Sequence, residues 1–567
     1  MKKFALPFLL IRFIPAKLVI ASLLLGTLAA TDFSYAASTD ATERCSAIAG
    51  MKLDGVAITA ANSIETGSFV SPIKAVAISG LPAFCRVAAT LRPTRDSNIH
   101  IELWMPEKNW NGRFLGTGNG GGAGHIIYRS LARGLELGYA TANTDMGTSP
   151  NADAVVGHPE RWADFGYRST HEMTAVSKKI VEAYYDRPEN RSYFVGCSTG
   201  GGQALMEAQR FPDDYDGIVA GAPANNRTHI HTGFLWNLQA TNKAPGVQLS
   251  PATIAFITKS VVAACVGRDG GAPGDTFLTD PRECKFDPDT LPKCGGNNRA
   301  DCLTPAELAT LKKIYAGPTN PRTGERIYTP IPVGSENSPA GIAMQQNPAA
   351  MSDELYPYRW AFGANFDYAK FDFDRDQYAV DRKLAPMLNA NDPDLSRMKK
   401  RGGRILMFTG TADPLVPYQD ALNYYERAIQ AQQSRLAATG GVAKRQALEE
   451  TQEFFRYFLV PGMAHCGGGP GLHDFGQDLR LDLPQDSEHD ILTALVAWVE
   501  QGIAPDKIVA STYVDDDPAK GIRLQRPICA YPKFPNYIGG DRKSASSYRC
   551  VDHPRDDVLV PAKRYLN

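Results

Sequence analysis

The segment with the strongest chemical signature is a short glycine-rich stretch around one serine. It reads Gly196-Cys197-Ser198-Thr199-Gly200 and follows a short apolar run. A strand entering G-x-S-x-G and continuing as a helix is the setting of a nucleophile elbow, where small flanking residues permit the strained turn that exposes a serine hydroxyl. The same motif also arises by chance in glycine-rich loops. Ser198 is therefore a candidate nucleophile that needs partners.

Two later segments supply an acid and a base. A serine nucleophile needs a base to take its proton and a carboxylate to fix the imidazole tautomer, and in α/β-hydrolases these follow in the order Ser, acid, His. The apolar run 405–408 leads into a turn that holds Asp413, and 458–460 leads into a loop that holds His465. Catalytic groups of open α/β sheets gather at this end of the strands. We expect Asp413 to orient His465 and His465 to act as general base. The alternatives are that Asp413 only caps a turn and that His465 is one of ten scattered histidines.

The glycine-rich loop 116–124 is the expected source of an oxyanion hole. Acyl transfer needs backbone N–H groups directed at the developing oxyanion. We expect these from Thr199, which follows the nucleophile, and from Gly121, with Gly120 as its nearest rival. The loop also matches G-x-G-x-x-G, with Asp145 at a distance suited to ribose binding. That motif is weak, and an exported chain is a poor setting for a soluble NAD enzyme, so we expect no cofactor in catalysis.

The ten cysteines all follow the N-terminal segment, and their number is even. In an exported chain this favours disulfides over metal ligation, and no paired C-x-x-C spacing indicates a metal site. Spacing predicts four pairs: Cys45–Cys85, Cys265–Cys284, Cys294–Cys302 and Cys529–Cys550. Cys197 and Cys466 remain, and a bond between them would hold nucleophile and base side by side. A zinc motif beginning at His171-Glu172 fails because position 175 is alanine.

The first 36 residues resemble an export signal. Lys2, Lys3, Arg12 and Lys17 precede an apolar run over 18–30, and the small-x-small sequence 34–36 predicts cleavage after Ala36. The alternative is an uncleaved anchor, but the run is short for a membrane span. No later segment has the 18 apolar residues that a span requires, so we expect no membrane contact after cleavage and a secreted or periplasmic protein.

The net charge narrows the classes of molecule that this protein is expected to bind. With 60 Lys+Arg against 61 Asp+Glu, the formal net charge is -1, which argues against nucleic acid or an anionic membrane as partner. Small neutral ligands fit better.

The pattern of elements predicts an α/β fold with an insertion. Strand-like runs at 99–105, 113–115, 139–143 and 192–195 alternate with helical stretches at 168–185 and 202–210, as in a parallel sheet covered by helices. The sheet resumes at 404–409 and 455–460, a helix is expected at 491–501, and 428–450 has the pattern of a polar surface helix. The segment 225–401 breaks the pattern and holds four cysteines. We expect core segments at 37–224 and 402–567 and a disulfide-stapled second domain between them.

Several of these motifs together resemble the tannase and feruloyl esterase family of exported serine esterases. The matching stretches are 118–124 (GNGGGAG), 164–168 (DFGYR), 196–201 (GCSTGG), 211–224 (FPDDYDGIVAGAPA), 410–417 (GTADPLVP) and 462–471 (GMAHCGGGPG). The resemblance implies an α/β-hydrolase core interrupted by a lid, a disulfide between Cys197 and Cys466, and hydrolysis of aromatic carboxylic esters.

The resemblance also implies a structural calcium ion in the lid, in a loop that corresponds to 265–275 here. Asp269 and Asp275 are the expected ligands. Val266 stands where a first aspartate is expected, and the loop before Asp275 is longer. Because calcium takes six to eight oxygens, we expect the site to be weakened or abolished.

Aromatic residues crowd the segment 356–373, and they suggest where an aromatic substrate would bind. Arg359, Trp360 and Phe362 are the expected contacts, although most of these rings are expected to build the lid's own core. Arg359 would pair with a free carboxylate or bind a phenolic oxygen. We favour feruloyl, hydroxycinnamoyl or galloyl esters. The alternatives are a terephthalate half-ester, or a non-catalytic protein that binds aromatic ligands.

Overall fold

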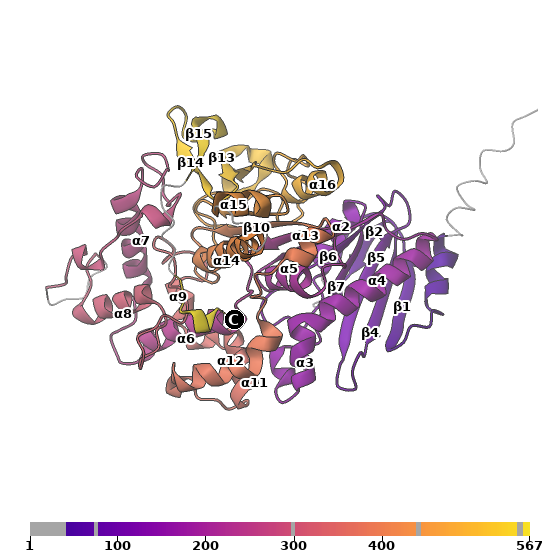
Figure 1. Ribbon diagram of the computed structural model, residues 1–567, viewed down its shortest axis with the longest axis horizontal. Helices are drawn as coiled ribbons and strands as arrows, with labels where there is room; N and C mark the ends of the chain where they lie inside the picture. Colours follow the sequence, from indigo (N-terminus) through magenta and orange to yellow (C-terminus); the bar gives the residue numbers. More distant parts are fainter. Residues whose placement is uncertain (1–40, 73–76, 296–300, 438–443, 553–559, 567) are drawn as a thin grey trace, which may run out of the picture.

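The computed structural model describes residues 41–72, 77–295, 301–437, 444–552 and 560–566 (Figure 1). The predicted export signal, 1–36, lies outside the described residues. The fold is an α/β-hydrolase fold: a mixed sheet has helices on both faces, and a helical region packs beside it. No described helix is both long and apolar enough to cross a membrane.

The main sheet has nine strands in the order β1-β4-β5-β7-β6-β8-β9-β10-β11. Its strands are β1 (Val56–Ile64), β4 (Phe84–Leu91), β5 (Ile99–Pro106), β6 (Arg113–Thr117), β7 (Ala140–Thr144), β8 (Arg191–Cys197), β9 (Gly217–Gly221), β10 (Arg404–Gly410) and β11 (Phe455–Val460). The strands from β7 to β11 pair in parallel, whereas β1, β4, β5 and β7 pair antiparallel. Parallel strands are buried on both faces, which explains the continuous apolar runs at 192–195 and 405–408.

Helices cover both faces of this sheet. One face packs against α4 (Ser169–Tyr185), α5 (Thr199–Arg210), α14 (Tyr418–Ala437) and α15 (Lys444–Gln452), and the other packs against α2 (Tyr128–Glu136) and α16 (Ile491–Gln501). The short α3 (Pro159–Ala163) precedes α4. Helix α16 has the predicted bounds because both ends carry strong signals: Asp490 accepts a hydrogen bond from the Thr493 amide, and Gly502 adopts a left-handed conformation.

The stretch predicted as an insertion enters the chain between β9 and β10 and is helical. Its helices are α6 (Arg227–Asn242), α7 (Pro251–Cys265), α8 (Pro305–Ala316), α9 (Ile342–Gln345), α10 (Pro348–Met351), α11 (Tyr356–Phe362), α12 (Arg375–Leu388) and α13 (Ser396–Lys400). Figure 1 shows α6 to α12, in pink to orange, gathered beside the sheet. Two disulfides, Cys265–Cys284 and Cys294–Cys302, crosslink this region, which we call the lid.

Three features of the fold differ from or extend the sequence expectations. Of the predicted surface helix over 428–450, the described residues form the end of α14 and most of α15, and 438–443 lie outside the described residues; α14 begins ten residues earlier than predicted because Tyr424 and Tyr425 are buried against the sheet. The chain after α16 forms two antiparallel pairs, β12 (Lys507–Tyr513) with β13 (Ile522–Cys529) and β14 (Lys533–Tyr537) with β15 (Tyr548–Asp552). A third short pair joins β2 (Gly67–Val70) and β3 (Ala77–Leu81).

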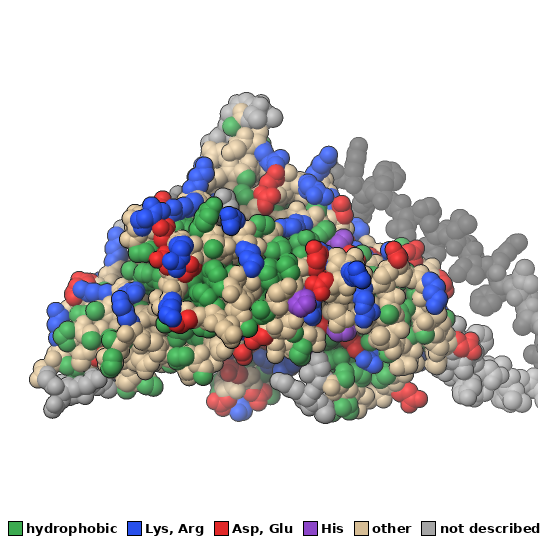
Figure 2. Space-filling model, turned by 90° about the horizontal axis from the view of Figure 1, so that it is seen from below, with side chains coloured by type: hydrophobic (Ala, Val, Ile, Leu, Met, Phe, Trp, Pro, Cys, Tyr) green, Lys and Arg blue, Asp and Glu red, His purple; other side chains and the backbone are tan. Residues whose placement is uncertain are grey.

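Charged side chains of both signs are interspersed over the surface seen in Figure 2. No extended patch of a single sign stands out on this face, as the near-zero net charge leads one to expect. Proteins that bind nucleic acid typically present a strongly basic face, unlike the face seen here.

Candidate active site

Ser198 lies in a strained turn between β8 and α5. Its backbone has φ 62° and ψ −121°, a conformation that is uncommon for a residue with a side chain. Neighbouring segments approach too closely for larger residues: a Cβ atom at Gly196 would lie 2.4 Å from the Gly200 oxygen, and one at Gly118 would lie 2.5 Å from the Gly200 Cα. The glycines therefore allow the close packing that holds the serine in this conformation.

Asp413 and His465 meet at the ends of two adjacent parallel strands. Asp413 follows β10 and His465 follows β11, whose last residues are paired in register. The Nδ1 atom of His465 lies 2.8 Å from Oδ2 of Asp413. The other carboxylate oxygen accepts hydrogen bonds from the amides of Leu415 (2.9 Å) and Val416 (3.0 Å). Because Asp413 is fully buried and its oxygens are bonded, the imidazole is held in one orientation, and its Nε2 has no hydrogen-bond partner among the described residues.

The electrostatics of this pair favour a basic histidine. Burial by itself lowers the pKa of His465, but the charge of Asp413 and its hydrogen bond raise it, with a further contribution from Glu354 in the lid. The net result is a pKa above the ordinary value of 6.5. Nε2 is thus suited to accept a proton.

Ser198 and His465 line the same cavity, which has a volume of about 320 Å³ and lies between the sheet edge and the lid. Gly120, Gly121 and Thr199 contribute to its wall on the core side, and α6 contributes on the lid side. The structure therefore brings together the five residues that the sequence singled out for catalysis: Ser198, Asp413, His465, Thr199 and Gly121.

The glycine-rich loop is fastened to helix α5 by polar contacts. The Thr199 hydroxyl donates to the Gly121 carbonyl (2.7 Å), and the Gly200 amide donates to the Asn119 carbonyl (2.8 Å). The side chain of Gln203 accepts from the Asn119 amide (2.9 Å). Sequence reasoning missed Gln203, whose position one helical turn after Thr199 was the available signal.

The disulfide between Cys197 and Cys466 joins the elbow to the histidine loop, with the two Cα atoms 5.9 Å apart. The other four disulfides join the pairs that spacing predicts, and no described cysteine is free. A crosslink that closes a loop of 269 residues stabilises the fold by about 5 kcal/mol in the chain-entropy model.

Two motifs with alternative chemistry lie outside this cavity. Asp145 accepts hydrogen bonds from the backbone of His100 and Gly147, which explains its burial without a ribose. His171, in α4, has its Nδ1 atom 2.7 Å from a carboxylate oxygen of Asp214.

The predicted aromatic contacts lie elsewhere in the lid. Arg359 donates hydrogen bonds to the Asp153 carboxylate and the Tyr368 hydroxyl, Trp360 is buried in the lid core, and Phe362 is partly exposed. None of the three lines the cavity with Ser198. The lid residues that do so are Arg227, Ile230, His231 and Phe234 of α6, together with Glu354.

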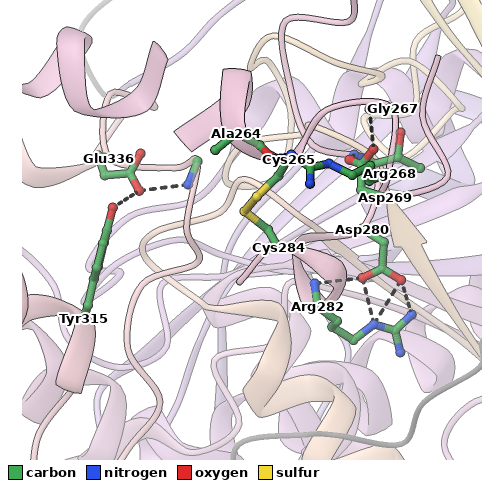
Figure 3. The surroundings of a disulfide bond; sticks show 12 residues. Ala264, Cys265, Gly267, Arg268, Asp269, Asp280, Arg282, Cys284, Tyr315 and Glu336 are labelled. Atoms are coloured by element: carbon green, nitrogen blue, oxygen red, sulfur yellow. Dashed lines mark hydrogen bonds and ion pairs between the residues drawn. A yellow bond between two sulfur atoms is a disulfide. The ribbon is translucent and has the colours of Figure 1, made fainter. Parts of the chain in front are cut away.

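The residues expected to hold calcium do not fit that ion. Asp269 accepts three backbone N–H bonds, from Gly267, Gly271 and Thr279, and Figure 3 shows it beside Gly267 and near the Cys265–Cys284 disulfide. Asp275 is bound by the guanidinium of Arg526 at 2.7 Å, and this arginine is fully buried. A fixed cation thus already neutralises the carboxylate that calcium would need.

Comparisons with known proteins agree with this fold. The family model described as tannase and feruloyl esterase matches residues 85–551. An uncharacterized esterase of Xanthomonas campestris pv. campestris is 39% identical, over 96% of this chain and 97% of its own. A probable feruloyl esterase B-2 of Aspergillus flavus is 34% identical, over 79% and 83% of the two chains.

Solved structures show the same architecture. An esterase from Aspergillus oryzae superimposes with a TM-score of 0.81 at 29% identity, covering 90% of this chain and all of its own. Feruloyl esterase B from the same organism gives 0.80 at 27% identity, with the same coverage. The fold and the comparisons define a carboxylic ester hydrolase. The chain belongs to the tannase and feruloyl esterase family.

The crosslink at the cavity yields a first prediction. Replacing Cys197 and Cys466 with alanine should lower kcat/KM for an aryl ester by about a hundredfold, because small displacements of reacting groups are costly. Replacing Cys529 and Cys550, which join β13 to β15, is the matched control and should leave kcat/KM nearly unchanged. Equal losses in the two double variants would contradict a positioning role.

The buried arginine yields a second prediction. A chelator should leave the melting temperature unchanged, because Arg526 already supplies the positive charge at Asp275. Arg526→Met should destabilise the fold by about 3–5 kcal/mol, since it leaves a buried carboxylate unpaired. Thermal unfolding with and without added calcium checks both statements, and a calcium-dependent rise in the melting temperature of the wild-type protein would refute the first.

Proposed function

We propose that this protein hydrolyses esters of aromatic carboxylic acids, of the hydroxycinnamoyl or galloyl type, through an acyl-enzyme on Ser198. The observation that carries the proposal is the hydrogen-bonded Asp413–His465 pair. A disulfide joins the residue after His465 to the residue before Ser198, and His465 and Ser198 line the same cavity. The feruloyl esterases named among its relatives support the aromatic acid.

In the first half-reaction, Oγ of Ser198 attacks the ester carbonyl carbon and its proton passes to Nε2 of His465. The tetrahedral intermediate collapses, the bond to the alcohol oxygen breaks, and His465 returns the proton to the leaving alcohol. In the second half-reaction, a water molecule attacks the acyl group while His465 takes its proton. The acid is then released and the hydroxyl of Ser198 is restored. Asp413 keeps its charge throughout and stabilises the imidazolium.

The negative charge that forms on the carbonyl oxygen is met by the amides of Thr199 and Gly121. Thr199 is the first residue of α5, where a helix leaves N–H groups without intrahelical acceptors. The bond between its hydroxyl and the Gly121 carbonyl keeps the two amides at a fixed separation. Such preorganised donors are commonly the largest single contribution to the rate of acyl transfer.

We also propose that the protein acts outside the cytoplasm. Five disulfides suit an oxidising compartment, and the basic and apolar segment before Ala36 suits export. N-terminal sequencing of protein recovered from the cell exterior or the periplasm tests this directly.

The catalytic assignment predicts non-additive losses. Ser198→Ala and His465→Ala should each lower kcat by roughly 10⁴–10⁶-fold, and the double variant should lose little more, because the members of a triad act as a unit. Turnover of 4-nitrophenyl acetate and of methyl ferulate measures the effect, with circular dichroism to verify folding. Normal turnover in Ser198→Ala would end the proposal.

The pKa of His465 predicts the acid limb of the pH profile. His465 must be neutral to act as base, so kcat/KM should fall as the pH drops through its pKa, with a midpoint above 6.5. In Asp413→Asn the contribution that raises the pKa is lost while burial still lowers it, so the midpoint should move to lower pH and the plateau should drop. A midpoint that stays in place would argue against Asp413 as the partner of His465.

A further inference from the structure

One face of helix α6 lines the same cavity as Ser198. Arg227, Ile230, His231 and Phe234 are three or four residues apart, the spacing that places side chains in one stripe along a helix. The stripe is polar at its N-terminal end and apolar at Phe234. Glu354, from the turn just before α11, lines the same cavity.

Arg227 has hydrogen-bonding capacity that the described protein does not use. Its guanidinium has five N–H donors, and Nη1 donates to the Tyr356 hydroxyl at 3.2 Å. It also lies over the ring of Phe165, 5.4 Å from the centroid. Among the described residues no carboxylate lies within ion-pair distance of Arg227, although the arginine is only 6% exposed.

His231 and Glu354 are similarly unsatisfied. Neither ring nitrogen of His231 has a hydrogen-bond partner of good geometry among the described residues, although the ring lies near the backbone of Glu354; the ring packs edge-on against Tyr356 and Phe234. Burial, and then the charge of Arg227, keep the pKa of His231 well below its ordinary value, so the ring is neutral with one donor and one acceptor. No described residue donates a hydrogen bond to the Glu354 carboxylate, whose pKa is raised by burial and lowered in part by Arg227 and His465.

A donor and an acceptor that face one cavity can be satisfied together by a ligand group that both donates and accepts hydrogen bonds. A hydroxyl group can do so, because it donates to Glu354 or His231 while accepting from Arg227. A carboxylate would pair with Arg227 but would bring a second negative charge beside Glu354. We propose that Arg227, His231 and Glu354 form a specificity site that selects esters carrying neutral hydroxyl groups over unsubstituted or carboxylate-bearing esters. This inference rests on the proposed function.

The test compares ratios of kcat/KM between matched esters. Methyl caffeate against methyl cinnamate places hydroxyls on the acid, and glyceryl cinnamate against methyl cinnamate places them on the alcohol. Monomethyl terephthalate against methyl benzoate tests a carboxylate. A ratio within one variant cancels any change in the common chemical step, including a change in the basicity of His465.

We expect the wild-type protein to favour the hydroxylated ester in at least one arm by about tenfold or more, the discrimination expected when a charged group hydrogen-bonds the substrate. Glu354→Gln and Arg227→Met should each bring that ratio close to one. Asp353→Asn is the matched control, because Asp353 precedes Glu354 but does not line the cavity, and it should retain the wild-type ratio.

Several outcomes would overturn the proposal. Wild-type ratios near one, or ratios that survive in both variants, would show that the site does not read hydroxyls. A preference for the terephthalate half-ester that is lost in Arg227→Met would make it a carboxylate site instead. If the protein hydrolyses methyl cinnamate but shows no preference in kcat/KM for the hydroxylated esters, this inference alone is refuted. If it hydrolyses none of the esters, the proposed function is refuted as well. Should Arg227→Met not fold, Glu354→Gln carries the same test from a half-buried turn outside α6.

Discussion

The disulfide between Cys197 and Cys466 links two parts of the chain that are 269 residues apart, with the whole lid between them. One end, Cys197, directly precedes the strained serine turn, and the other, Cys466, directly follows His465, the proposed general base. The serine turn is held between β8 and α5, whereas the described loop that carries His465 has a regular element only directly before it, β11, and Cys466 itself has a positive φ. The covalent bond fixes the separation of the two loops independently of the lid that lies between them in the chain.

The parallel half of the sheet determines where those loops can meet. Strands β8, β10 and β11 end at the same edge, so the residues that follow them converge although they lie far apart in sequence. The antiparallel strands β1, β4 and β5 extend the sheet on the other side and contribute a buried face, not side chains for the cavity. The C-terminal strands, joined by Cys529–Cys550, hold Arg526 against the lid loop that carries Asp275. In this chain an internal ion pair anchors that loop to the core.

The two sides of the cavity also differ in polarity. The core side presents small residues and backbone groups, which suits the stabilisation of a transient oxyanion. The lid side presents the side chains of α6 and Glu354, among which the two ring nitrogens of His231 are buried without a hydrogen-bond partner in the described protein. Unpaired buried polar groups cost stability, and these lie where a ligand could bond them. In the proposed function, the core side of the cavity serves the chemistry and the lid side serves the selectivity.

The sequence by itself determined the elements and residues whose signals are local. The G-x-S-x-G turn at Ser198, the positions of Asp413 and His465 after apolar strands, and helix α16 with its two caps follow from steric and hydrogen-bonding rules that act over a few residues. The four closely spaced cysteine pairs follow from loop length, and the fifth pair consists of the two cysteines that remain.

The roles of Arg359 and Arg227 were decided only by the tertiary structure, because each arginine acts through partners distant in sequence. Asp153, 206 positions before Arg359, accepts a hydrogen bond from its guanidinium. Arg227 instead lines the cavity and has no carboxylate partner among the described residues. Likewise, Arg526 meets Asp275 across 251 positions. Which charge is satisfied inside the protein, and which is left for a ligand, depends on such long-range contacts, and no local pattern encodes them.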